Sequence, residues 1–428
     1  MLKKLNLKFV FVVTLLLVLS FTINSVQAVE ITFWSGETEE QRQAVIREMV
    51  SDFEAENPDI SVEIVPIHES NLPDQIMAAI PAQQLPDVIE LGLEHVLLMS
   101  NFDLLDVDVA TDILNNIGID DYFSGPIDMT TLNGNHLAVP MHGWVQGIWY
   151  RQDWFDEAGL DAPETWDSIA EAAEYFYNPP ESYGIVTGTK ADHYARQSFN
   201  QFAFSNNAYL FDEDGNINFD SPEMLETVEF YKELVNFAPP GPQDHRDGRS
   251  LYMADQLAMV VYSSFFMGTL ESGAPELIEH TGFAPRMVKE SEAVYGQFQS
   301  LGVPVTSSDE EKEAAQKLIE FMLTGDNYID YLHMAPAGML PVRESVANNP
   351  DYRDHEILNL FGEQHDDILA ALEVANAFGF EHGQIFPQIG DISAQFVIGT
   401  AFAEMIDQDL SPEEVVERIQ NRMMDIVD

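Results

Sequence analysis

The chain has 428 residues, of which 73 are acidic and 19 are basic, and it carries a formal net charge of −54 and no cysteine. Such a charge repels nucleic acid and anionic membranes, and the lack of cysteine excludes disulfides, thiolate metal sites and an N-terminal lipid-modified cysteine. A hydrophobic content of 46% argues against disorder. Because the acids are spread along the chain, the composition predicts a folded protein that works in concentrated salt, where self-repulsion is screened.

Residues 1–28 predict a secretory signal peptide. Three lysines precede an apolar run over 9–21, and Val26-Gln27-Ala28 offers small residues at the positions that a signal peptidase reads. The alternative, a retained membrane anchor, is less favoured because the run is short for a spanning helix. Cleavage after Ala28 leaves a periplasmic or secreted chain of 400 residues, not lipidated, whose net charge is −57 once the three lysines are lost.

The first elements after the leader alternate between strand and helix. Apolar spacing predicts a strand over 31–34, a helix over 39–56, a strand over 60–64, a short helix over 74–80 and a strand over 88–91. This order is typical of a parallel sheet covered by helices on both faces.

A second unit is expected after Pro140. Its predicted elements are a strand at 149–150, a helix over 166–177, a helix from 221, a strand over 258–262, a helix over 310–323 and a last helix that opens with a capping box at 411–414. No low-complexity linker separates the two units. The mature length is too great for one core, so we expect two lobes joined by crossing strands, with a cleft between them.

The enzyme motifs are absent. The chain has no H-E-x-x-H, no G-x-G-x-x-G and no G-x-S-x-G, and GIVTGTK at 184–190 is one residue short of a P-loop. The segment DEDGNINFD has its glycine at the fourth position, not the sixth that an EF-hand needs, and is expected to be a tight turn. The sequence therefore predicts no catalytic residue, cofactor or metal site. A carboxylate pair for glycoside hydrolysis stays open, because 73 acids always supply candidates.

Several aromatic residues occupy positions that core packing explains less well. Trp34 ends a strand, Trp144 lies in the polar segment PMHGWVQG, Phe265 follows a strand, and Phe298 lies in YGQFQS. Ligands of open α/β sheets bind at the carboxyl ends of the strands, where aromatic faces can stack on sugar rings. Each aromatic alone is more often core, but together they favour a carbohydrate cleft.

Taken in order, several segments resemble an extracellular solute-binding protein of an ABC sugar importer, of the maltose-binding-protein cluster. The most specific are the pair NPDISVEIV and LPDVIE, and the segment LAVPMHGWVQGIWYRQDWFDEAGLDAPETW; ITFWSG, GNINFDSPE, ADQLAMVVYSSFF and APAGMLPVRESV also match. The resemblance runs from about residue 30 to the C-terminus. It implies an α/β fold of two lobes, each a mainly parallel sheet flanked by helices, hinged by crossing strands. The expected division gives 29–142 plus 297–338 to the first lobe and 143–296 plus 339–428 to the second.

The resemblance also implies where the ligand is bound. The turn after the first strand would face the cleft, as would the segments after LPDVIE and after Pro140, and Phe265 and Phe396 stand where the family has stacking tryptophans. His95 is a further candidate of this kind. The predicted ligand-binding residues are Trp34, Ser35, Gly36, Glu37, Glu90, Glu94, His142, Trp144, Phe265, Phe298 and Phe396. Phenylalanine stacks less area than tryptophan, so the ligand is expected to be smaller than a long maltodextrin, or not an α-glucan.

The function implied by the resemblance is that of a monomeric receptor. It would close on a mono- to oligosaccharide and deliver it unchanged to the membrane subunits of an ABC permease, with no enzymatic activity and no nucleic acid partner. A receptor for glycerol phosphate or another polar osmolyte is the alternative within the family, with Arg246 and Arg249 as the close arginine pair. The alternatives of other classes are a secreted glycoside hydrolase or lyase and a calcium-loaded structural protein.

Overall fold

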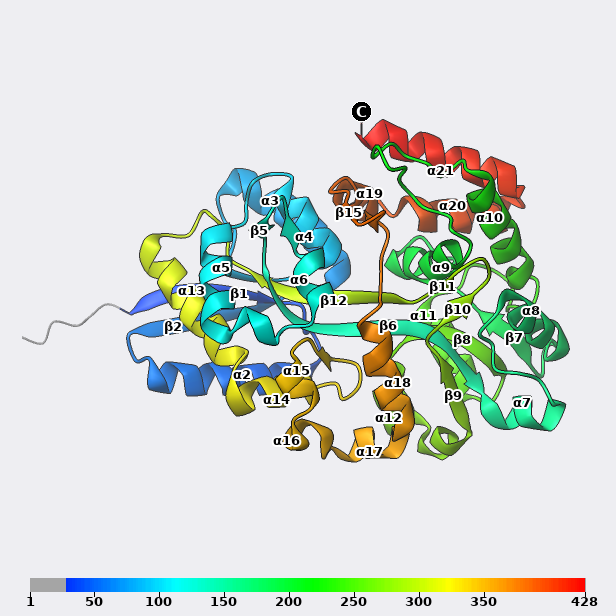
Figure 1. Cartoon of the computed structure of the whole chain (residues 1–428), viewed down its shortest axis with the longest axis horizontal. Helices are drawn as coiled ribbons and strands as arrows, with labels where there is room; N and C mark the ends of the chain where they lie inside the picture. Colours follow the sequence, from blue (N-terminus) through cyan, green and yellow to red (C-terminus); the bar gives the residue numbers. More distant parts are fainter. Residues whose placement is uncertain (1–27, 428) are drawn as a thin grey trace, which may run out of the picture.

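A computed structural model of the chain describes residues 28–427, and the predicted signal peptide therefore lies almost wholly outside the described residues. Figure 1 shows two lobes side by side, with two strands passing from one lobe to the other. These crossing strands are β6 (Val139–Arg151) and β12 (Tyr295–Gly302), and they pair antiparallel with each other. The α/β fold of two lobes predicted from the sequence is confirmed.

The first lobe holds most of the N-terminal third of the chain and a later segment, residues 309–353. Its elements are β1 (Val29–Ser35), α2 (Glu40–Glu56), β2 (Ile60–Pro66), η1 (Glu69–Asn71), α3 (Leu72–Ala82), β3 (Val88–Gly92), α4 (Leu93–Ser100), α5 (Val107–Ile117), η2 (Ile119–Asp121), α6 (Ser124–Met129), β4 (Thr131–Leu132), β5 (Asn135–His136), α13 (Asp309–Met322), α14 (Gly325–Leu332), β13 (Leu340–Pro341), α15 (Glu344–Ala347) and α16 (Pro350–Arg353).

The second lobe holds the middle of the chain and the C-terminal helices. Its elements are α7 (Gln152–Ala158), α8 (Trp166–Tyr175), β7 (Tyr183–Val186), α9 (His193–Ser205), α10 (Pro222–Val235), α11 (His245–Met253), β8 (Leu257–Ser263), α12 (Phe266–Gly273), η3 (Pro275–His280), β9 (Thr281–Ala284), β10 (Met287–Val288), β11 (Glu292–Ala293), α17 (Glu356–Phe361), α18 (Glu363–Leu372), β14 (Phe380–Glu381), β15 (Gln384–Ile385), α19 (Ile389–Ala394), α20 (Val397–Gln408) and α21 (Pro412–Val427).

One mixed sheet runs through both lobes, in the order β2-β1-β3-β12-β6-β8-β7. At its first end β1 pairs parallel with β2 and β3, and at its other end β7 pairs parallel with β8. Antiparallel pairing is concentrated at the crossing strands β12 and β6. The carboxyl ends of β1 and β3 therefore come together beside the crossing strands, which is where ligands of such sheets bind.

The lobes touch above the crossing strands, where α19 packs on α4. A Cβ added to Gly390 in α19 would come 2.7 Å from the backbone nitrogen of Leu98, so a larger residue cannot fit between the two helices. The Asn101 side-chain amide donates to the Pro387 carbonyl at 3.2 Å and to Asp391 at 3.0 Å. These contacts hold the second lobe close to the first on this side of the cleft.

The chain just beyond the expected lobe boundary at 338 still packs against the first lobe. Asp121 accepts hydrogen bonds from the Arg343 guanidinium at 2.9 Å and from the backbone N–H of Ser345 at 2.9 Å.

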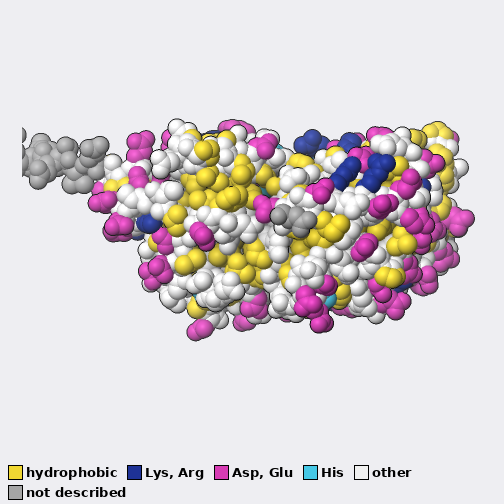
Figure 2. Space-filling view, turned by 90° about the horizontal axis from the view of Figure 1, so that it is seen from above, with side chains coloured by type: hydrophobic (Ala, Val, Ile, Leu, Met, Phe, Trp, Pro, Cys, Tyr) yellow, Lys and Arg dark blue, Asp and Glu magenta, His cyan; other side chains and the backbone are white. Residues whose placement is uncertain are grey.

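Acidic side chains are scattered over the face seen in Figure 2, whereas Lys and Arg side chains gather over part of the second lobe. Among residues 28–427, no helix has the length and apolar character needed to cross a membrane.

Candidate ligand-binding cleft

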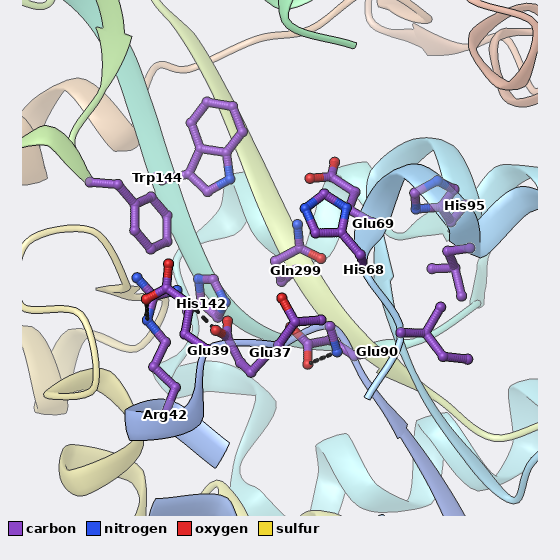
Figure 3. Close-up of a pocket in the computed structure, with 16 residues that line it drawn as sticks. Glu37, Glu39, Arg42, His68, Glu69, Glu90, His95, His142, Trp144 and Gln299 are labelled. Carbon is purple, nitrogen blue, oxygen red and sulfur yellow. Dashed lines mark hydrogen bonds and ion pairs between the residues drawn. The ribbon is translucent and has the colours of Figure 1, made fainter. Parts of the chain in front are cut away.

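A cavity of about 230 Å³ lies between the lobes, where β1 and β3 end beside the crossing strands. Figure 3 shows carboxylates, imidazoles and an indole converging on it from separate segments of the chain. The lining residues used below come from the turn after β1, from α2, from η1 and the residue before it, from β3, α4, β6 and β12, and from the segment that joins β8 to α12. They are Gly36, Glu37, Glu39, Arg42, His68, Glu69, Glu90, His95, His142, Trp144, Phe265 and Gln299.

The turn after β1 is held against β3 by Glu90. The Glu90 carboxylate accepts a hydrogen bond from the backbone N–H of Gly36 at 2.8 Å and another from the Ser35 hydroxyl at 3.3 Å. A Cβ added to Gly36 would lie 3.1 Å from the other Glu90 oxygen, so glycine lets the carboxylate approach the backbone. Ser35 therefore lies beneath the cavity, and Glu90 forms part of its floor.

Two buried carboxylates, Glu37 and Glu90, share this floor. Glu37 is 8% exposed and receives a hydrogen bond from the Arg42 guanidinium at 2.9 Å, while Glu90 is 6% exposed. No Lys or Arg of residues 28–427 forms an ion pair with Glu90. Burial, and then the negative charge of Glu37, raise the pKa of the Glu90 carboxyl to about 8. Glu90 is therefore protonated at neutral pH unless a ligand supplies positive charge or hydrogen-bond donors.

His142 of β6 completes the floor. Its side chain is 1% exposed, and neither ring nitrogen has a hydrogen-bond partner among the described residues. Burial, followed by the nearby Arg42 charge, lowers the pKa of the His142 imidazole to about 3, so the ring is neutral. The ring of Tyr331 lies 6.1 Å away between centroids, and its buried hydroxyl also lacks a partner in the described chain. Polar atoms left without partners at such depth are expected to bind something.

Aromatic side chains form another part of the wall. Trp144 of β6 is 8% exposed and meets Tyr295 edge to face at 5.7 Å between ring centroids. Phe265 follows β8, and the Arg42 guanidinium of the first lobe lies 5.3 Å from the centre of its ring. The cavity thus combines apolar ring faces with carboxylate and imidazole edges. These groups complement a sugar or polyol, whose C–H surfaces can pack on the rings and whose hydroxyls can bond to the polar edges.

The structure brings Gly36, Glu37, Glu90, His142, Trp144 and Phe265 together at the cavity, and His95 with them. Others of the predicted residues lie elsewhere. Trp34 is half-buried within β1, where it pairs with Val65 and Ile89, and Phe298 is fully buried in the core. That the residues at the cavity bind a ligand stays a prediction.

Glu94 and Phe396 also lie away from the cavity. Glu94 forms a buried ion pair with Arg196 of α9 and accepts a hydrogen bond from the Gln297 amide at 2.9 Å. Phe396 packs edge to face on His193 at 4.6 Å between ring centroids and lines a separate, much smaller cavity. The sequence prediction missed Glu39, Arg42, His68, Glu69 and Gln299 at the main cavity. The sequence does indicate a place near the cavity for Arg42, because this residue lies in the first turn of α2, the helix that follows the turn at Gly36 and Glu37.

Comparison with known proteins agrees with this architecture. The model of the family described as "Bacterial extracellular solute-binding protein" matches residues 36–328, well over half of the chain. The chain belongs to this family. The family predicted from the sequence is therefore confirmed, and it is a family of binding proteins and not of enzymes.

The relatives extend over most of the chain. Escherichia coli K12 YcjN, named as an ABC transporter periplasmic-binding protein, is 31% identical over 87% of this chain and 86% of its own length. The arabinooligosaccharide-binding protein of Halalkalibacterium halodurans is 23% identical over 71% of this chain and 68% of its own. The maltose-bound MalE3 structure of T. maritima has a TM-score of 0.79 at 22% identity, over 93% of this chain and 99% of that one, and shares the fold.

Proposed function

We propose that the chain is an extracellular receptor that captures a small carbohydrate or polyol between its lobes and delivers it unchanged to the permease of an ABC importer. The observation that carries this proposal is the cavity floor, where Glu90, Glu37 and His142 offer hydrogen-bonding edges beside the indole of Trp144. Sugar-binding relatives in the same family support the ligand class. The predicted export of the chain agrees with such a role.

The charge of the cavity favours a ligand that is not an anion. Four carboxylates, those of Glu37, Glu39, Glu69 and Glu90, line it with a single guanidinium, that of Arg42. Arg42 already pairs with Glu37. A phosphate group needs free arginine donors or a helix N-terminus, and it would meet the carboxylates at close range. Glycerol phosphate is therefore the less favoured ligand, and Arg246 and Arg249 do not line the cavity.

The size of the cavity favours a short ligand. Its volume of about 230 Å³ lies below the range of roughly 300–1,000 Å³ that is usual for pockets of drug-sized ligands. A monosaccharide, a disaccharide or a sugar alcohol is the class that we expect. This agrees with the phenylalanine at 265, which offers a smaller stacking face than a tryptophan would.

Capture would work as a shift between open and closed arrangements of the lobes. A ligand favours closure only by the contacts that it makes in the closed state beyond those in the open state. Here the carboxylates of the floor come from the first lobe and Phe265 from the second, so a bound ring would touch both. The closed form is then the natural signal for a permease, and no bond of the sugar needs to break.

Calorimetric titration of the mature protein tests the proposal. In about molar KCl, which screens the surface charge, we would titrate arabinose, maltose, mannitol and glycerol phosphate and then recover the ligand. A one-to-one complex with an unchanged sugar or polyol is expected. Binding of glycerol phosphate alone would contradict the assigned ligand class, and steady heat with product formation would make the protein a hydrolase.

A paired variant makes the titration site-specific. Trp144→Ala removes the stacking face while it leaves every carboxylate in place, and we expect it to weaken sugar binding by about tenfold or more. Tyr175→Ala, an exposed aromatic on the second lobe far from the cavity lining, is the matched control. Equal affinities of the two variants would refute the cavity as the binding site.

A further inference from the structure

Three metal-ligating side chains converge on the floor of the cleft in an arrangement that sugar binding alone does not require. One ligand atom each from Glu37, Glu90 and His142 lies within 4.8 Å of the other two. All three residues are more than nine-tenths buried. They come from three different segments, the turn after β1, strand β3 and strand β6, so no local sequence pattern brings them together.

The donor atoms at this position are free. Both nitrogens of His142 lack partners among residues 28–427. Gly36 and Ser35 donate to one oxygen of Glu90, and Arg42 donates to one oxygen of Glu37, so each carboxylate keeps a second oxygen. A buried imidazole without partners, directed at two buried carboxylates, is an independent sign of a missing ligand, because buried polar groups in native proteins are normally satisfied.

We propose that Glu37, Glu90 and His142 bind one divalent transition cation, of the Zn²⁺ class, at the floor of the cleft. Ligand bonds of such an ion are about 2.0–2.2 Å and its shell is tetrahedral, so its donors stand roughly 3.4 Å apart. The ligand atoms now lie within 4.8 Å of one another, and rotation of the side chains by about 1 Å would bring them to that spacing. Three protein ligands leave at least one position of the ion open, and this position faces the cavity.

The donor set selects the class of metal. Imidazole nitrogen combined with carboxylate oxygen suits Zn²⁺, Mn²⁺, Fe²⁺ and related ions, whereas Mg²⁺ and Ca²⁺ prefer oxygen ligands alone. Arg42 does not exclude a cation, because it is already neutralised by Glu37 at 2.9 Å and, more weakly, by Glu39 at 3.8 Å. The open position could accept a hydroxyl of the sugar or polyol proposed above, but the cation site does not depend on that ligand.

Equilibrium dialysis of the mature protein against Zn²⁺, in about molar KCl with excess Mg²⁺, tests the site. The salt and the Mg²⁺ suppress diffuse binding to the acidic surface. We expect one Zn²⁺ per chain to remain. Glu90→Gln and His142→Gln should each weaken binding by about 100-fold or more, since even partners outside the ligand shell contribute 10–100-fold.

A matched variant separates the cluster from the general negative charge of the cavity. Glu39→Gln removes one cavity carboxylate but no donor of the cluster, and we expect it to weaken Zn²⁺ binding by less than about tenfold, as the loss of one distant charge would. Absence of bound Zn²⁺, or binding that His142→Gln leaves unchanged, would overturn the proposal. A thermal melt of each variant excludes loss of the fold as the cause.

A second probe reports on the imidazole directly. Co²⁺ in place of Zn²⁺ gives a visible spectrum that depends on its ligands, and His142→Gln should shift or abolish it while Glu39→Gln should not. Because no sugar is present in these experiments, a protein that binds no sugar can still support the cation site. A protein that binds sugar with or without chelator but never Zn²⁺ would refute this inference alone.

Discussion

Glu90 and Glu94 are two glutamates that lie four residues apart, in β3 and in the first turn of α4, and each is 6% exposed. Their surroundings differ completely. Glu94 forms an ion pair with Arg196 of the second lobe and accepts from the Gln297 amide, whereas Glu90 faces another carboxylate, Glu37, and accepts from Gly36 and Ser35.

The difference separates two uses of a buried carboxylate. Around Glu94 the protein itself supplies the countercharge, and the result is a cross-link between the lobes. Around Glu90 the described chain supplies no cation, so the charge is suppressed by a raised pKa of about 8 until something else compensates it. Burial alone therefore does not identify a binding residue. What identifies it is whether the protein itself supplies the group that compensates the charge. The following substitutions test that distinction.

The largest effect is expected from breaking the Glu94–Arg196 pair. Arg196→Met leaves the Glu94 carboxylate buried without its guanidinium, and we expect a loss of about 3–5 kcal/mol in the free energy of unfolding. Urea denaturation in about molar KCl measures it. The double variant Glu94→Gln with Arg196→Met should recover more than half of the loss, because no charge is then stranded. A loss below about 1 kcal/mol for Arg196→Met would contradict the cross-link.

An effect of similar size but of opposite sign is expected at Glu90. In the folded protein the pKa of the Glu90 carboxyl is about 8, above its usual value of 4.5. Between these two pH values the folded state holds a proton that the unfolded state has released, so the contribution of Glu90 to stability falls as the pH rises and levels off above about 8. Glu90→Gln removes this loss. The variant should match the wild type near pH 4.5 and exceed it at pH 9 by about 4–5 kcal/mol, since the difference between pKa 4.5 and about 8 is worth roughly 1.4 kcal/mol per pH unit.

Thermal unfolding at pH 5, 7 and 9 measures this gap, with both proteins free of ligand and metal. Two other titratable groups near Glu90 do not imitate the effect. His142 stays neutral throughout this range, because its pKa is about 3, and burial raises the pKa of the Tyr331 hydroxyl far above it. A gap that is constant from pH 5 to pH 9 would refute the assignment of the shift to Glu90.

The next effect concerns the aromatic wall. Phe265→Ala should lower the affinity for the sugar or polyol found by titration by about tenfold, because the ring face next to Arg42 is lost. Phe396→Ala is the matched change, at a phenylalanine that the sequence also predicts as a binding residue but that packs on His193 away from the cavity. We expect Phe396→Ala to lower the affinity for the ligand by less than about threefold. Equal losses would restore Phe396 to the binding site.

The sequence predicts the regular elements well where the signal is local. The apolar spacing over 310–323 corresponds to α13 at Asp309–Met322, and the expected helix over 39–56 corresponds to α2. Strand β6 was predicted at 149–150 alone, although it spans Val139–Arg151. Because β6 is buried along almost its whole length, its sequence lacks the alternation of apolar and polar residues that marks a half-exposed strand. Its polar residues His142, Gln146 and Arg151 make the segment resemble a loop.

The site was predicted less completely, for a physical reason that Phe298 illustrates. Neighbouring residues of a strand point to opposite faces, so an error of one position selects the wrong side. In β12 the sequence prediction chose Phe298, which is fully buried in the core, whereas the next residue, Gln299, lines the cavity. Tyr331 approaches the floor only through tertiary packing. By contrast Gly36, Glu37 and Glu90 follow from their positions at strand ends.

The smallest effect is expected from an ion pair on the surface. Arg47 donates to Glu40 at 2.6 Å, but the two side chains are 48% and 82% exposed. Arg47→Met should change the free energy of unfolding by less than about 0.5 kcal/mol at low salt and by nothing measurable in about molar KCl, where exposed charges are screened. The loss caused by Arg196→Met should persist in the same salt, because water and ions do not reach that pair. If added salt reduced both losses alike, burial would not be what makes the Glu94 cross-link strong, and the contrast with Glu90 would fail.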